Sequence, residues 1–224
     1  MSSYYLVIIV CIIVILLTFI FIWKNKSLFF LNSLLKKAKN GSPKAQMLLG
    51  FMYYTGKGVK KNLSEGLTWF NKAAENGDVE AQFILAGIYF EGNIVDKNFQ
   101  KGIDWIKKSA EGGYAPAQLA LGNMYAEGRF VEKSTAASIK WFILAAEGKN
   151  LQAQKIVAGI YHLSPGYDKK VAYAWYSVAA FMGDNYSKDV AETLFQTFSD
   201  EDKVSASELS SLYISKYTNK SKLD

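Results

Sequence analysis

Copies of one 36-residue pattern constrain the fold of this 224-residue chain more than any other feature. In the first three copies, an Ala-Gln pair is followed by a tyrosine, a glycine and, in the second half, a tryptophan. The copies begin at Ala45, Ala81 and Ala117, and a fourth, shortened by two residues, begins at Ala153. A fixed period of this length is typical of stacked repeats, because one unit alone cannot bury its hydrophobic face.

Each copy predicts two antiparallel helices. The first helix of the first copy is expected over 43–55, because Ser42 is a good N-cap and Pro43 fits the first helical turn. Gly56 ends it, since glycine readily adopts the left-handed conformation of a helix stop. A second helix is expected from Asn62 or Leu63 to about Glu75. Ala45, Leu49, Gly50, Tyr53 and their equivalents are nearly fixed among the copies, so they are predicted core residues.

The repeats divide the chain into segments. The predicted organisation is a tail at 1–3, a transmembrane helix at 4–23, a basic segment with a half-repeat at 24–41, four repeats at 42–183, capping helices at 184–217 and a flexible tail at 218–224. The half-repeat is inferred because Ala38 and Gly41 lie 36 residues before Ala74 and Gly77.

Residues 4–23 contain no charge, proline or glycine. Twenty helical residues span about 30 Å, the thickness of the hydrocarbon core of a bilayer. A cleaved signal peptide fits less well, because no basic residue precedes the apolar run and no small-residue cleavage site follows it. The positive-inside rule places the C-terminal side in the cytoplasm, because Lys24, Lys26, Lys36, Lys37 and Lys39 all follow the span.

The composition narrows the function. The net charge is +6, but the sequence shows no basic stripe interleaved with aromatics, so no nucleic acid is expected as a partner. Cys11 is the only cysteine and His162 the only histidine, and neither has neighbours typical of a nucleophile or a metal site. We therefore expect no catalytic, cofactor-binding or metal site, no enzymatic activity and no small-molecule substrate.

The segment from Ala45 to Gly77 resembles the Sel1-like repeat, a relative of the tetratricopeptide repeat, and the resemblance covers roughly 28–200. It implies an all-α fold, a right-handed α-solenoid of about four helix-turn-helix repeats, which binds proteins rather than catalysing a reaction. Two departures fall in the loops. Ile94 and Phe130 replace the second loop glycine, and Ser164-Pro165-Gly166 replaces the loop glycines of the fourth copy.

In tetratricopeptide-like stacks the first helix of each pair lines the concave groove, so variable positions there are candidates for partner binding. Eight such residues are predicted to bind another protein, as a peptide or helix in the groove: Leu48, Phe51, Tyr54, Ile84, Phe90, Asn123, Ile156 and His162. The row of Leu48, Ile84 and Ile156 is apolar, and core packing is the alternative explanation for it. Aromatics dominate binding hot spots, so Phe51 and Tyr54 are the preferred anchor pair.

Two functions stay open at this stage. The first is a single-pass adaptor or scaffold of a bacterial inner membrane, with its solenoid in the cytoplasm. The second is an immunity protein that neutralises an antibacterial effector, with its solenoid in the periplasm if that effector attacks the envelope. Partner identity and topology distinguish the two.

Overall fold

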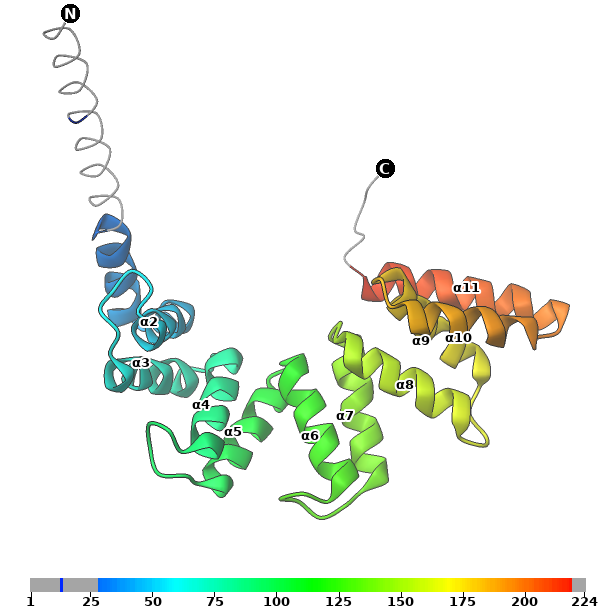
Figure 1. The fold of residues 1–224 in the computed structure, drawn as a ribbon, viewed down its shortest axis with the longest axis horizontal. Helices are drawn as coiled ribbons and strands as arrows, with labels where there is room; N and C mark the ends of the chain where they lie inside the picture. Colours follow the sequence, from blue (N-terminus) through cyan, green and yellow to red (C-terminus); the bar gives the residue numbers. More distant parts are fainter. Residues whose placement is uncertain (1–12, 14–27, 219–224) are drawn as a thin grey trace, which may run out of the picture. The chain divides into compact units, whose positions relative to one another are not determined.

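The computed structural model describes residue 13 and residues 28–218, and the described part is helical with no strand in it (Figure 1). A helical segment at 28–39 precedes ten labelled helices. These are α2 (Pro43–Thr55), α3 (Leu63–Glu75), α4 (Val79–Glu91), α5 (Phe99–Glu111), α6 (Ala115–Glu127), α7 (Thr135–Glu147), α8 (Leu151–Leu163), α9 (Lys169–Phe181), α10 (Asn185–Gln196) and α11 (Asp200–Tyr217). The predicted helix pairs are therefore confirmed, as α2 with α3, α4 with α5, α6 with α7 and α8 with α9.

Capping side chains fix where the helices begin. The Ser42 hydroxyl accepts a hydrogen bond from the Ala45 amide at 3.4 Å, and the Asn62 side chain accepts one from the Glu65 amide at 3.1 Å. Each cap satisfies one of the amides that the first helical turn leaves without an intrahelical partner. At the other end of α2, Gly56 adopts a φ of 80° and stops the helix as predicted.

The chain divides into two compact units, with the boundary inside α4 between Leu85 and Ala86. In the first unit, Leu34 and Ala38 of the segment 28–39 pack in one buried cluster with Leu49 and Met52 of α2 and Trp69 of α3. The segment 28–39 thus covers α2 as the second helix of a preceding pair would.

A buried glutamine links each pair to the helix before it. Gln46 Nε2 donates to the Ala38 carbonyl at 2.9 Å, and Gln82 Nε2 donates to the Ala74 carbonyl at 3.0 Å. Gln118 and Gln154 repeat the bond, to Ala110 at 3.1 Å and Ala146 at 3.2 Å. The sequence pattern marked these glutamines but not their role, which is to satisfy a carbonyl at the end of the preceding helix.

Small residues let the paired helices approach closely. A Cβ added at Gly50 of α2 would lie 2.5 Å from Cδ1 of Phe70 in α3, and one added at Gly122 would lie 2.7 Å from Cδ1 of Phe142. In the second copy the equivalent residues are Ala86 and Ile106, so a larger residue in the first helix is matched by a smaller one in the second. The glycine is therefore a packing requirement of the phenylalanine opposite it.

The second unit ends in a cap that departs from the repeat. α11 packs against α9, and the Trp175 ring lies 4.7 Å from the Tyr217 ring and 5.0 Å from the Tyr213 ring between centroids. Trp175 and Tyr217 are buried in the cluster that forms the core of this end. The last helix therefore closes the hydrophobic face that a further repeat would otherwise cover.

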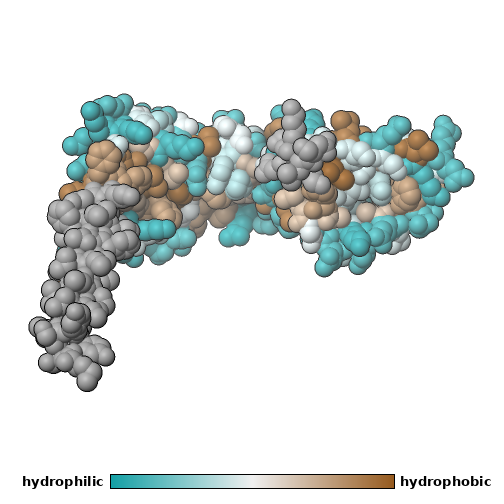
Figure 2. All heavy atoms as spheres, turned by 90° about the horizontal axis from the view of Figure 1, so that it is seen from above, coloured by the Kyte–Doolittle hydropathy of each residue, from teal (hydrophilic) through white to brown (hydrophobic). Residues whose placement is uncertain are grey.

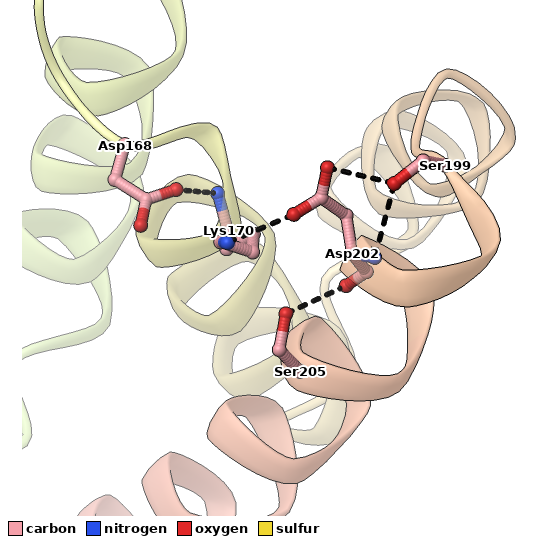
Figure 3. Close-up of polar contacts among 5 residues, drawn as sticks. All are labelled: Asp168, Lys170, Ser199, Asp202 and Ser205. Atoms are coloured by element: carbon pink, nitrogen blue, oxygen red, sulfur yellow. Dashed lines mark hydrogen bonds and ion pairs between the residues drawn. The ribbon is translucent and has the colours of Figure 1, made fainter.

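Two ion pairs hold this cap. Lys155 of α8 lies 2.6 Å from Asp184, the N-cap of α10, and Lys170 of α9 lies 2.9 Å from Asp202 of α11 (Figure 3). Hydrogen bonds from Lys155 and Ser187 lower the pKa of Asp184 to about 2. The bond between Lys170 and Asp202 raises the pKa of the lysine and lowers that of the aspartate.

The predicted transmembrane helix at 4–23 lies outside the described residues, apart from Ile13. Within residues 28–218 no helix is both long and apolar enough to span a bilayer.

Candidate partner-binding surface

The predicted residues of the first unit present two exposed apolar side chains on α2. Leu48 is 36% exposed and Phe51 is 45% exposed, and their spacing of three places them on the same face of the helix. Tyr54, the predicted partner of Phe51, is half-buried, with its ring centroid 6.1 Å from that of Phe70. Ile84 is also half-buried. Tyr54 thus supports the helix pair, whereas Phe51 is available to a partner.

The predicted residues of the second unit have different surroundings. Asn123 is exposed, whereas Ile156 packs against the core of the last repeats. The row of Leu48, Ile84 and Ile156 therefore changes from exposed to half-buried along the chain. An apolar surface that continued along the whole row would need all of these side chains to be exposed, and only Leu48 is.

His162 lines a cavity of about 470 Å³ at the end of α8. Lys169 of α9 and Tyr186 and Asp189 of α10 also line it. The imidazole lies edge-on to the Tyr176 ring, with 5.9 Å between centroids, and Tyr186 is 65% exposed. Burial raises the pKa of Tyr176, so its hydroxyl is neutral at physiological pH. The cavity offers aromatic and charged groups to a partner side chain but no pair arranged as nucleophile and base.

An aromatic cluster that the sequence patterns did not predict surrounds Phe90. Its ring lies 6.1 Å from that of Phe99 and 5.5 Å from that of Phe130, and the last two rings stack at 5.1 Å. The Lys97 ammonium lies 5.7 Å from the Phe99 ring, and the Arg129 guanidinium 5.0 Å from the Phe130 ring. Phe99 and Phe130 are 46% and 39% exposed.

Phe130 occupies the left-handed region, with a φ of 67°. The first repeat has Gly58 at this position, with a φ of 79°, so the loop keeps its glycine-type backbone after the glycine is replaced. A bulky residue in this region costs about 1–2 kcal/mol. The signal that could have identified the cluster was this replacement of a repeat glycine by a phenylalanine.

On the face that Figure 2 shows, hydrophobic side chains reach the surface in separate patches between hydrophilic ones. No group of three or more His, Cys, Asp or Glu residues within residues 28–218 is placed to hold a metal ion. Exposed apolar and aromatic side chains of this kind are typical of protein-binding surfaces.

The Sel1 repeat pattern matches residues 43–78, 79–114, 115–150 and 157–184, which is more than half of the chain, and the protein belongs to this family. Two solved structures resemble it well. A Sel1 repeat protein from Oxalobacter formigenes is 31% identical with a TM-score of 0.69, over 73% of this chain and 48% of that one. The protective antigen c5321 of uropathogenic Escherichia coli, with an SLR fold, is 33% identical with a TM-score of 0.64, over 81% and 40%.

The chain thus spans less than half the length of either structure. Immunity protein Pa5087 from Pseudomonas aeruginosa matches at 21% identity with a TM-score of 0.47, over 84% of this chain and 72% of that one. Comparison with curated proteins gives no match. The family's fold is a protein-interaction fold, so the class of protein defined here is a Sel1-repeat interaction module.

Proposed function

We propose that this protein is a membrane-anchored adaptor that binds a partner protein through the exposed face of α2. The observation that carries the proposal is the exposed pair of Leu48 and Phe51 on the first helix of the first repeat. Exposed apolar side chains on an otherwise hydrophilic surface mark interaction sites, and aromatic anchors contribute most of the binding free energy. Tyr54, half-buried and one turn further along the same helix, would lie beside a segment bound at Phe51.

The anchor is part of the proposal. The sequence supports it, because residues 4–23 are long and apolar enough to cross a bilayer and lysines follow them. On this hypothesis the repeats lie in the cytoplasm of a bacterial cell, at its inner membrane. A tether raises the local concentration of the module at the bilayer without any additional contact, which suits a protein that recruits or organises others.

Site-specific photocrosslinking of the full-length protein in its native membranes tests the partner-binding face. A photoreactive phenylalanine analogue replaces Phe51 in one variant and Thr68, an exposed residue of α3, in the control. We expect one defined crosslinked product from position 51 and not from position 68. The crosslinked protein is identified by mass spectrometry, purified and tested for weaker binding to the Phe51→Ala variant.

The identity of that partner separates the two functions. Envelope or signalling proteins would support the adaptor. A single stoichiometric antibacterial enzyme that the protein inhibits would instead make it an immunity protein. Equal crosslinking from positions 51 and 68 would contradict the proposed face of α2.

A further inference from the structure

The charge of the chain is divided sharply along its length. Nine lysines and no acidic residue precede Glu65: Lys24, Lys26, Lys36, Lys37, Lys39, Lys44, Lys57, Lys60 and Lys61. The remaining 17 basic residues and all 20 acidic residues follow, so the chain from Glu65 onward carries a net charge of −3 against +9 before it. The excess positive charge therefore belongs to the first repeat and the segment that leads to it.

Part of this charge is held in one loop. The loop between α2 and α3 is fixed by the left-handed Gly56 and Gly58 and by the Asn62 amide, which donates to the Tyr53 carbonyl at 2.9 Å. It presents Lys57, Lys60 and Lys61, all of which are exposed.

The equivalent loops of the other repeats do not share this charge. Residues 55–62 contain three lysines and no acid, whereas residues 91–98 contain Glu91, Asp96 and only one lysine. Residues 127–134 contain two basic and two acidic residues. Because all three loops connect equivalent helices, the fold does not require lysine at positions 57 and 60. The basic loop is specific to the repeat that follows the predicted span.

The loop lies against the beginning of the helical segment 28–39. Lys60 and Lys61 line a cavity of about 510 Å³ together with Leu31. The three preceding residues are large, apolar and exposed: Leu28 at 56%, Phe29 at 78% and Phe30 at 53%. Leu31 lies eight positions after Trp23, so even a fully extended chain would place it no more than about 28 Å from the end of the predicted span.

We propose that this face, formed by Leu28–Phe30 and the loop lysines Lys57, Lys60 and Lys61, binds anionic phospholipid headgroups of the membrane that holds the anchor. Apolar side chains enter the interface while lysines remain among the phosphates, as in other basic interfacial segments. The inference rests on the proposed anchor and adds a second, lipid-dependent contact. This contact would hold the first repeat against the bilayer and fix the direction in which the array leaves it.

The variant that tests the lipid contact is taken from the chain itself. Lys57→Asn with Lys60→Asp gives the first loop the residues that the second repeat carries at the equivalent positions, Asn93 and Asp96. Each lysine near an anionic surface favours it by about fivefold, so the change of three charges weakens the contact by about a hundredfold.

The measurement uses the full-length protein in phosphatidylcholine vesicles with and without phosphatidylglycerol. In a Cys11→Ser background, a spin label is placed at Ser64→Cys beside the loop or, as a control, at Gln100→Cys, the equivalent exposed position of the second repeat. A nickel chelate on trace lipid headgroups reports proximity to the surface by collision.

We expect phosphatidylglycerol to raise the collision rate at position 64 several-fold and to leave position 100 unchanged. The double variant and high salt should each remove the increase, since salt screens exposed charges. Equal rates with and without phosphatidylglycerol, or an increase that survives in the double variant, would overturn the proposal. Alkaline extraction from neutral vesicles tests the anchor separately. Release contradicts the anchor, whereas retention without an effect of phosphatidylglycerol contradicts only the lipid contact.

Discussion

The buried glutamine of the fourth repeat offers the sharpest test of how neighbouring repeats are joined. Gln154 is 1% exposed, its Nε2 donates to the Ala146 carbonyl at 3.2 Å, and its Oε1 has no hydrogen-bond partner among the described residues. The same carbonyl also accepts a hydrogen bond from the Lys149 amide at 3.0 Å. Loss of the glutamine donor therefore leaves the carbonyl with backbone partners only.

Two substitutions at this position should change the free energy of unfolding by very different amounts. Gln154→Met loses a hydrogen bond worth about 1 kcal/mol but also removes a buried oxygen whose desolvation costs about 1–3 kcal/mol. Its net effect on the free energy of unfolding should lie within about 1 kcal/mol of zero. Gln154→Glu places a buried carboxylate against a carbonyl oxygen, and an uncompensated buried charge costs about 3–5 kcal/mol at neutral pH.

The loss in the glutamate variant should depend on pH. Burial raises the pKa of a carboxyl group, and the protonated form can donate to the Ala146 carbonyl as the glutamine does. Stability should therefore recover as the pH falls below the raised pKa. Gln152→Glu is the matched control, because Gln152 is exposed in the first turn of the same helix, where a negative charge is favourable.

Urea unfolding of the full-length protein in mild detergent, followed by circular dichroism, measures these differences. Hydrogen exchange of the α8 and α9 amides locates them, since repeat arrays need not unfold as one unit. If the methionine variant loses as much stability as the glutamate variant, the hydrogen bond itself supplies the stability. If the glutamate loss is the same at pH 4 and pH 7, the assigned electrostatic cause is wrong.

Three further predictions concern exposed or capping residues. Phe51→Ala should weaken partner binding at least tenfold with little change in melting temperature, because Phe51 is exposed. Tyr54→Ala should lower the free energy of unfolding by about 1–2 kcal/mol, because Tyr54 packs against Phe70. A binding titration measures the first effect and calorimetry the second. In chemical unfolding, Phe130→Gly should be more stable than Phe130→Ala by about 1 kcal/mol. Both variants lose the ring, but only glycine adopts the left-handed backbone conformation without strain. If the alanine variant is the more stable, the backbone at position 130 is not strained. Lys155→Met should lower the free energy of unfolding by about 1 kcal/mol at pH 7. This difference from wild type should shrink as the pH falls from about 4 toward 2, because Asp184 becomes protonated there. An equal difference at pH 2.5 and pH 7 would show that the ion pair contributes nothing to stability.

Local signals were sufficient to predict most of the fold. Ser42, Asn62 and Gly56 set helix ends through contacts within a few residues, and the structure confirms all three. Because the pattern repeats every 36 residues, a helix boundary predicted in the first copy also predicts the equivalent boundary in the other copies. The Ala38 and Ala74 carbonyls, 36 residues apart in the sequence, accept the same glutamine hydrogen bond.

The candidate surface could be predicted only in part. Alignment of the copies identified Phe51 as variable, and the structure leaves it exposed, but Tyr54 varies equally and is half-buried against Phe70. The exposure of a side chain depends on the residue that faces it in the paired helix. An alignment of first-helix positions alone does not include that residue. The aromatic cluster was missed for the same reason, since Phe90, Phe99 and Phe130 come from three segments and meet only after folding.

Repetition gives each departure from the pattern a physical meaning. All copies stack their helix pairs in the same way, so a residue that only one copy carries is not required for stacking. Lysines at positions 57 and 60 and a phenylalanine at position 130 meet this condition, and each is exposed on a loop that the other copies build differently. Phe130 also lies in an unfavourable backbone region, where the repeat's own glycine would avoid the strain. Because a costly or unnecessary residue must be maintained by something other than the stack, these loops, together with the exposed face of α2, are where contacts with a membrane or a partner are to be sought.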